Sequence, residues 1–239
     1  MRKIAILVPS YDGKVCCNFS LSIAEIFRIG ASMPDISFHL QYLMHEALIQ
    51  RARNNLINDA YDQGMDDVVF IDADQSFDPQ AFFKLINYPV DVVGIPVRMK
   101  TEENRYNIRP ESCKEHKMNA DLGLIEVAAI GTGFLRLTRK AIEAVFELSE
   151  YYNDGDSRRA NAFEIRIFKG EIVSEDIIFC NKLTEAGFTI YVSPAYTAKH
   201  FGTKCWEGNF LDYYIGNIKE DLINQAYLVI DPSPQTPSA

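Results

Sequence analysis

Asp72 and Asp74 lie two positions apart, directly after the apolar run at residues 68–71. Four consecutive apolar residues predict a central strand that is buried on both faces. In open parallel sheets, ligands bind at the edge where such strands end. Because Mg²⁺ and Mn²⁺ prefer oxygen ligands and keep contacts with substrate phosphates, the pair predicts a site for one divalent cation. The alternative is two solvated aspartates in a turn.

Two later groups of residues could complete such a site. Ser174 is placed to cap a helix, and Glu175 and Asp176 follow it. These carboxylates either complement the helix dipole, or one of them is a general base. His200 comes after a predicted strand at 189–192 and a polar loop, where it could supply a third metal ligand. The other interpretation of His200 is a histidine with a structural hydrogen bond.

Strands and helices alternate along most of the chain, which predicts an α/β fold with a mostly parallel mixed sheet flanked by helices. Gly64 and Gly187 are placed to end helices, and Asp78 and Thr138 are placed to begin them. Predicted strands cover residues 3–8, 36–43, 67–71, 90–95, 124–129, 134–137 and 189–192. Predicted helices cover residues 19–28, 47–62, 79–87, 139–148 and 175–186.

The less regular segments predict three further features. The polar stretch 101–121 is either a solvated excursion or a lid or acceptor groove, and its cations and single tyrosine are Arg105, Arg109, Lys114, Lys117 and Tyr106. A polar, flexible connection is predicted at 151–162. Residues 1–205 are expected to form one domain, followed by a helical extension at 206–230 that packs on it and a proline-rich tail at 231–239. In the extension, Phe210, Tyr213 and Tyr214 favour core packing over a stacking surface.

Composition narrows the class of protein. The 239 residues are 47% hydrophobic, which is enough for a core that folds without metal or disulfides. A net charge of -9 and a pI near 5.0 disfavour nucleic acid and anionic lipid as partners. The five cysteines are expected to be reduced, mostly buried thiols in a cytoplasmic protein. No apolar run reaches the roughly 18 residues that a membrane span requires, and the sequence does not indicate an oligomeric state.

The order of these motifs resembles the GT-A glycosyltransferases, of the family 2 kind. The resemblance extends over residues 3–203 and rests on the order and spacing of the motifs together. The matching segments are Val8-Pro9-Ser10-Tyr11, Arg51-Ala52-Arg53-Asn54, residues 69–74 with their D-x-D motif, Gly131-Thr132-Gly133-Phe134, Glu175-Asp176, Gly187-Phe188 and His200. Enzymes of this short, single-domain sort occur in bacteria and their phages.

The resemblance implies a metal-dependent transfer of a sugar from a nucleotide-diphosphate donor, with a UDP-sugar favoured, to an acceptor hydroxyl. It implies Asp176 as the base of an inverting displacement, with Glu175 as the second candidate. Mn²⁺ or Mg²⁺ would be bound by Asp72, Asp74 and His200. Contacts with the nucleotide sugar are implied for Pro9, Ser10, Tyr11, Arg51, Arg53, Asp72, Ala73, Gly131, Thr132, Gly133 and Lys204.

These residue types suit that chemistry. A nucleoside diphosphate that leaves the sugar gains negative charge, which a divalent ion neutralises without proton transfer. A hydroxyl is a weak nucleophile near neutral pH, so a carboxylate that removes its proton assists the attack.

Other functions remain open at this stage. A haloacid-dehalogenase-type phosphatase also carries a strand-end D-x-D, but normally on its first strand. A nucleotidyltransferase would share the sheet and the metal, but no glycine-rich, basic loop follows the first strand. A non-catalytic glycan- or partner-binding module is the alternative from another class. Among acceptors, glycans, lipid-linked sugars, proteins and hydroxymethylated bases of phage DNA are all open, although the net charge disfavours DNA.

Overall fold

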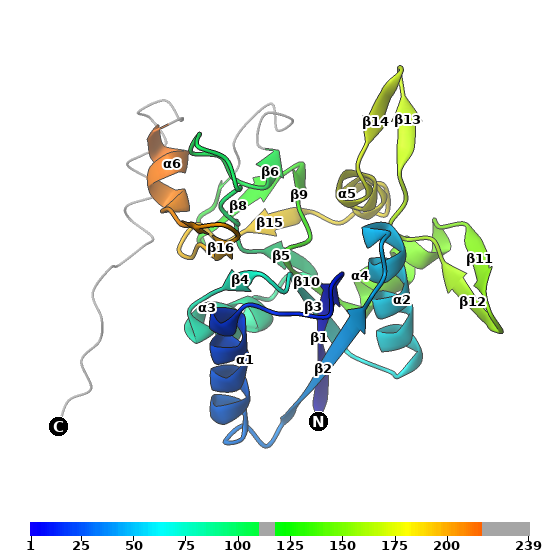
Figure 1. Cartoon of the computed structure of the whole chain (residues 1–239), viewed down its shortest axis with the longest axis horizontal. Helices are drawn as coiled ribbons and strands as arrows, with labels where there is room; N and C mark the ends of the chain where they lie inside the picture. Colours follow the sequence, from blue (N-terminus) through cyan, green and yellow to red (C-terminus); the bar gives the residue numbers. More distant parts are fainter. Residues whose placement is uncertain (110–117, 217–239) are drawn as a thin grey trace.

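The computed structural model describes residues 1–109 and 118–216, and its centre is an eight-stranded mixed sheet (Figure 1). The strand order is β2-β1-β3-β10-β5-β15-β8-β7, and all strands except β10 and β8 run in the same direction. The predicted mostly parallel mixed sheet is therefore confirmed. The bounds are β1 Arg2–Ser10, β2 Ile36–Met44, β3 Asp67–Ile71, β5 Val92–Gly94, β7 Met118–Asn119, β8 Leu124–Val127, β10 Phe134–Thr138 and β15 Ile190–Val192.

Helices cover both faces of this sheet, with α1 and α3 on one face and α2, α4 and α5 on the other (Figure 1). Alternate residues of β3 divide between the two layers: Val68 and Phe70 join the cluster with α2, α4 and α5, whereas Val69 and Ile71 join the cluster with α1 and α3. This alternation explains why β3 is apolar throughout. The helices are α1 Cys17–Gly30, α2 Ile49–Asp62, α3 Pro79–Asn87, α4 Arg139–Glu147, α5 Glu175–Glu185 and α6 Phe210–Gly216.

Local capping groups set most helix boundaries. The Asp78 side chain accepts a hydrogen bond from the Gln80 amide at 2.9 Å, and the Thr138 hydroxyl accepts one from the Ala141 amide at 3.4 Å. These contacts satisfy amides that the first helical turn leaves unpaired. Gly64 has a φ of 70°, the left-handed conformation that ends a helix. The predicted starts of α3 and α4 are therefore confirmed.

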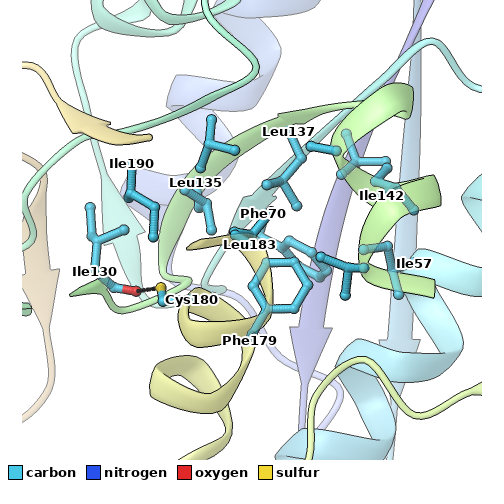
Figure 2. Packing of buried hydrophobic residues seen from close by; sticks show 14 of the residues in the cluster. Ile57, Phe70, Ile130, Leu135, Leu137, Ile142, Phe179, Cys180, Leu183 and Ile190 are labelled. Carbon is cyan, nitrogen blue, oxygen red and sulfur yellow. Dashed lines mark hydrogen bonds between the residues drawn. The ribbon is translucent and has the colours of Figure 1, made fainter. Parts of the chain in front are cut away.

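One face of the sheet packs against α5 around Phe70, Phe179 and Cys180 (Figure 2). The Cys180 thiol donates to the Ile130 carbonyl at 3.4 Å, and burial raises the pKa of this thiol to about 12. Cys17 and Cys205, by contrast, are exposed, so the expectation of mostly buried thiols is wrong for these two.

Short strands make up the rest of the described chain. Around the carboxyl edge of the sheet lie β4 Gln75–Ser76, β16 Lys199–Phe201 and β17 Cys205–Trp206, which pair with one another, and β6 Ile108–Arg109, which pairs with β9 Ala129–Ile130. Two hairpins complete the set: β11 Tyr151–Asp154 with β12 Ser157–Ala160, and β13 Arg166–Phe168 with β14 Glu171–Val173. The predicted flexible connection at 151–162 is wrong, because the first hairpin occupies it. Figure 1 shows the second hairpin projecting beside α5.

The carboxyl-terminal part of the described chain packs on the domain. Phe210 and Tyr214 of α6 are buried in the core, and the Tyr106 and Phe210 rings meet edge to face at 5.1 Å. Core packing is therefore confirmed for these two aromatic residues. The predicted extension beyond residue 216 and the predicted tail at 231–239 lie outside the described residues, as do Lys114 and Lys117. Within residues 1–109 and 118–216, no helix is both long and apolar enough to cross a bilayer.

A buried ionic cluster joins three neighbouring strands, β1, β3 and β10, near the centre of the sheet. Asp67 on β3 is 2% exposed and accepts hydrogen bonds from Arg2 at 2.6 Å and from Arg136 Nε at 2.8 Å. Arg136 lies on β10, is 4% exposed, and also donates to the Val90 carbonyl. Because a buried charge is stable only when it is paired, Asp67 allows an arginine to occupy the interior of the sheet.

We expect Asp67→Ala to lower the free energy of unfolding by about 3–5 kcal/mol, because it leaves the Arg136 guanidinium buried without a carboxylate. Urea denaturation would measure the loss as a lower midpoint. The matched control is Glu25→Ala, which removes the exposed partner of Arg28 and should leave the urea midpoint close to that of the wild type. Equal losses in the two variants would contradict the assigned importance of the buried cluster.

Candidate active-site cleft

A cleft of about 650 Å³ opens at the carboxyl ends of β1 and β3. The end of β1, the loop after β3, the first turns of α2 and the strand β16 form its walls. Several residues from the sequence prediction line this cleft together: Pro9, Ser10, Tyr11, Arg53, Asp72, Ala73, Asp74 and His200. These residues are far apart in the sequence, and the parallel strands bring them to one edge of the sheet.

Asp74 and His200 face each other in this cleft. The His200 Nε2 atom lies 3.2 Å from Asp74 Oδ1, and the Lys100 Nζ atom lies 2.5 Å from Asp74 Oδ2. The backbone supports the arrangement, because the Phe201 amide donates to the Asp74 carbonyl at 2.7 Å. His200 lies within the short strand β16, paired with Gln75 of β4, rather than in a loop. This pairing fixes the imidazole opposite the aspartate.

The second ring nitrogen of His200 is also engaged. His200 Nδ1 lies 3.1 Å from the Arg98 carbonyl oxygen, which only accepts hydrogen bonds. Nδ1 therefore carries a proton in this contact, and Nε2 is the ring nitrogen that faces Asp74. A carbonyl that holds the far nitrogen of an imidazole in this way is typical of metal-binding histidines.

The environment of Asp74 favours its ionised form. Burial raises the pKa of this carboxyl group, but hydrogen bonds from His200 and Lys100 lower it by more. The net effect is a pKa below the ordinary value for aspartate. A carboxylate that is fully ionised at neutral pH is what a hard divalent cation needs as a ligand.

Asp72 faces in a different direction from Asp74. Its Oδ1 atom lies 3.3 Å from Arg53 Nη2, and its Oδ2 atom lies 3.5 Å from Gln75 Nε2. Among the described residues, no three histidine, cysteine or acidic side chains are arranged as a metal-binding group. The structure therefore brings Asp74 and His200 together but places the Asp72 carboxylate against the guanidinium of Arg53.

Arg53 is 7% exposed and bridges two carboxylates. Besides Asp72, it contacts Glu175 with an Nη1–Oε1 distance of 2.5 Å. The side chain of Glu175 is only 12% exposed, and this ion pair occupies it. Glu175, predicted as the second candidate for the base, is therefore engaged in an ion pair with Arg53. Asp176, the next residue, lines the smaller pocket beside the cleft.

A smaller pocket of about 250 Å³ continues inward from the cleft. The two cavities share Arg53, Asp72, Lys100 and His200. The segment Gly131-Thr132-Gly133 and Asp176 line the inner end. Both glycines permit close approach: a Cβ atom on Gly133 would lie 2.8 Å from Asp72 Oδ2, and one on Gly131 would lie 3.3 Å from Asp176 Oδ2. These distances show that side chains pack closely against the segment, and its predicted contact with the donor sugar stays a prediction.

The carboxylate of Asp176 is held at one oxygen and open at the other. Its Oδ1 atom accepts hydrogen bonds from the Ser174 hydroxyl and from the Ile177 amide, the latter at 2.8 Å. Ser174 occupies the N-cap position of α5, but its hydroxyl binds this carboxylate instead of a backbone amide. The Oδ2 atom is directed toward Gly131 at the wall of the inner pocket.

A third pocket of about 400 Å³ begins where the inner pocket ends. Met99, Asn107, Gly131 and Asp176 border both. The outer wall of the third pocket comes largely from the stretch predicted as a lid or acceptor groove, and includes Arg105, Tyr106, Ile108 and Arg109 together with Tyr213 of α6. The three cavities therefore adjoin one another in a row: Asp74 and His200 line the first, and Asp176 lines the second and third.

Two predicted contacts lie elsewhere. Arg51 pairs with Glu46 at 2.5 Å, and Lys204 pairs with Glu102 at 2.8 Å. Both side chains are about half exposed, and neither lines the three cavities. Helical geometry accounts for Arg51, because residues two apart on a helix cannot share the face that Arg53 directs inward.

Sequence reasoning missed two residues of the site, Lys100 and Asn107. Lys100 contacts Asp74 across 26 positions, and the Asn107 side chain donates to the Gly131 carbonyl at 3.2 Å and accepts from the Val97 amide at 2.8 Å. Both lie in or beside the irregular stretch after β5. A single cation or amide in a polar stretch carries no periodic signal that could have identified it.

Solved structures share this architecture. The crystal structure of A197 from STIV aligns with 84% of this chain and 86% of its own, with a TM-score of 0.52 and 17% sequence identity. A structure of GalNAc-T7 with UDP, GalNAc and Mn²⁺ aligns with 84% of this chain but 44% of its own, with a TM-score of 0.50 and 11% identity. No protein-family model and no curated protein sequence matches the chain. At these identities the likeness concerns the fold, and it confirms the predicted GT-A fold.

We expect Gly133→Ala to disturb the wall of the inner pocket. The new methyl group would lie 2.4 Å from Gln75 Nε2 and 2.8 Å from Asp72 Oδ2, so these side chains must shift, at a cost of about 1–3 kcal/mol in urea denaturation. Gly202→Ala is the control, because its methyl group would meet Lys100 at an ordinary 3.5 Å. If Gly133→Ala were as stable as Gly202→Ala, the close packing described here would be wrong.

Proposed function

We propose that this protein is a glycosyltransferase that moves a sugar from a nucleotide-diphosphate donor, with a UDP-sugar favoured, to an acceptor hydroxyl. One observation carries the proposal: three adjoining cavities at the carboxyl edge of a GT-A sheet place the Asp74–His200 pair and the carboxylate of Asp176 along the same row. A site for phosphates and cation thus lies at one end, and a base for the acceptor at the other. The GalNAc-T7 structure contains UDP, GalNAc and Mn²⁺, which agrees with this class of donor and metal.

Asp74 and His200 suit Mn²⁺ or Mg²⁺ as the two protein ligands. The carboxylate is ionised, and the imidazole is oriented by the Arg98 carbonyl. Mn²⁺ accepts this mixed oxygen and nitrogen set readily, and donor phosphates and water would complete the coordination. When bound, the ion supplies charge neutralisation to the departing diphosphate. We assign Asp72 mainly to Arg53, with any contact to the ribose or metal as a second role.

The donor nucleotide fits the large cleft, where Pro9, Ser10 and Tyr11 form the wall at the end of β1. The donor sugar would enter the inner pocket. Three polar side-chain atoms there are buried and have no hydrogen-bond partner among the described residues: Arg53 Nε, Gln75 Oε1 and Thr132 Oγ1. Because an unpaired buried polar group costs about 1–3 kcal/mol, sugar hydroxyls that pair with these atoms would stabilise the complex.

Asp176 is proposed as the base that deprotonates the acceptor hydroxyl. Its Oδ1 atom is fixed by Ser174 and Ile177, so Oδ2 is free to accept the proton at the junction of the inner and outer pockets. A base on the side of the sugar opposite the diphosphate favours a single displacement with inversion. Glu175 supports this arrangement indirectly, since its ion pair with Arg53 holds the start of α5.

The acceptor is proposed to occupy the outer pocket, and a glycan is favoured. Tyr106 and Tyr213 line this pocket together with Arg105 and Arg109. A hydroxymethylated base of phage DNA remains the alternative acceptor, although the net charge of -9 disfavours a DNA partner. A cytoplasmic location is proposed as well, because a reducing compartment suits the four free cysteines described.

The direct test is the release of nucleoside diphosphate from a panel of nucleotide sugars with Mn²⁺. We expect release from at least one donor, and faster release when a suitable acceptor is added. Formation of a nucleotide sugar from a nucleoside triphosphate would instead indicate a nucleotidyltransferase. Binding without turnover would indicate a glycan-binding module. Hydrolysis of a generic phosphate ester, with no donor cleaved, would indicate a phosphatase and overturn the proposal.

We expect UDP with Mn²⁺ to raise the melting temperature of the wild type by roughly 5–10 °C at ligand concentrations 100-fold above Kd, because ligands that bind only the folded state stabilise it. Asp74→Ala removes a metal ligand and should abolish most of this shift. Asp62→Ala, which removes an exposed carboxylate at the end of α2, should retain it. A full shift in Asp74→Ala would exclude Asp74 from the metal site.

We expect Asp176→Asn to lower kcat for sugar transfer by about 100- to 10,000-fold, the range for loss of a general base. UDP affinity should stay close to that of the wild type, because Asp176 lies outside the large cleft. The control is Glu171→Gln on the exposed strand β14, and it should transfer normally. A variant Asp176→Asn with full kcat would refute the assignment of the base.

A further inference from the structure

Lys100 holds the carboxylate that we assign to the metal. Its Nζ atom lies 2.5 Å from Asp74 Oδ2, on the oxygen that His200 does not contact. A divalent ion bound to Asp74 and His200 would bring its own charge close to this ammonium. Two cations cannot share one carboxylate at short range without strong repulsion. Metal binding and the Lys100–Asp74 contact therefore compete.

Lys100 can leave Asp74 without unfolding its surroundings. Its side chain is 36% exposed, and that of Asp74 is 42% exposed. The backbone nearby is anchored, since the Met99 amide donates to the Arg105 carbonyl at 2.9 Å and Val97 forms a bridge with Ala198. A lysine on a fixed backbone but with a flexible four-carbon side chain can swing over a short distance.

The same side chain borders the space that we assign to the donor diphosphate. Lys100 lines both the large cleft and the inner pocket, and among the described residues Arg53, Asp72 and His200 share this position. Arg53 is already paired with two carboxylates, so Lys100 is the cation at this boundary that can change partner. A diphosphate that crosses from one cavity to the other would pass beside it.

We propose that Lys100 is an exchangeable counter-charge: it neutralises Asp74 in the metal-free protein and moves to the donor diphosphate when the metal binds. The inference rests on the proposed function, since it takes Mn²⁺ and a nucleoside diphosphate as the ligands. It implies that metal and nucleotide assist each other. The metal alone must displace Lys100, whereas a diphosphate offers the displaced ammonium a new partner. By reciprocity, each ligand raises the affinity for the other by the same factor.

The test compares Lys100→Met with the wild type in two titrations. Mn²⁺ alone, followed by electron paramagnetic resonance of the free ion, should bind the variant roughly two- to five-fold more tightly, the range expected for loss of a competing exposed ion pair. The second titration measures UDP binding by calorimetry, once with and once without Mn²⁺. The ratio of the UDP affinity with Mn²⁺ to that without Mn²⁺ should be lower in Lys100→Met than in the wild type, by at least the factor by which Mn²⁺ binding tightens. Neither readout depends on turnover.

Lys199→Met is the matched control. Lys199 also makes an ion pair at 2.5 Å, with Glu207, and lies beside His200 on β16, but it does not contact Asp74. Its removal changes the net charge equally and should leave both titrations as in the wild type. Mn²⁺ binding by Lys100→Met that is no tighter than by Lys199→Met would overturn the inference.

Two further outcomes separate this inference from the proposed function. If UDP binds the wild type equally with and without Mn²⁺ and binding is lost in Lys100→Met, then Lys100 permanently replaces the metal and the exchange is refuted, while a nucleotide site stands. If UDP does not bind the wild type under either condition, the proposed preference for a UDP-sugar is wrong, and the Mn²⁺ titration alone still decides whether Lys100 competes with a metal.

Discussion

The buried guanidinium of Arg53 is the constraint on which the rest of the site depends. It extends from α2 and contacts Asp72 after β3 and Glu175 at the start of α5. A charge this buried is tolerated only when carboxylates surround it, so the sheet edge and the helix start are held together by the same cation. Because Asp176 follows Glu175 directly, the ion pair also sets where the proposed base lies relative to the cleft.

The parts of this structure that were predictable from sequence rest on local signals. Buried β3 followed from four apolar residues in succession, and α3 followed from Asp78 and the proline after it. Two hairpins were equally local but were missed. The Gly155-Asp156 and Lys169-Gly170 loops are two-residue connections of the kind that joins adjacent strands, with φ values of 60° at Gly155, 52° at Lys169 and 83° at Gly170. The polar composition of the first hairpin concealed its turn chemistry.

The candidate site was predictable as a set of residue types but not as a set of contacts. Parallel strands end at one edge, so Asp74 and His200 could be expected to lie near each other. Which carboxylate meets which cation depends on pairings between distant segments, such as the 122 positions between Arg53 and Glu175. No periodicity in the sequence encodes these pairings, which is why the partners of Asp72, Glu175 and Lys100 emerge only from the fold.

The D-x-D pair therefore performs two electrostatic tasks instead of one. Asp72 is already paired with the buried guanidinium of Arg53, so we propose Asp74 as the carboxylate of the pair that is available to a metal. Asp72 stabilises Arg53 within the wall between the large cleft and the inner pocket. Asp74 lines the large cleft, where its partners are the imidazole of His200 and the partly exposed ammonium of Lys100. The fixed Arg53–Asp72 pair and the exchangeable Lys100–Asp74 pair would let the protein bind a charged donor without moving its proposed base.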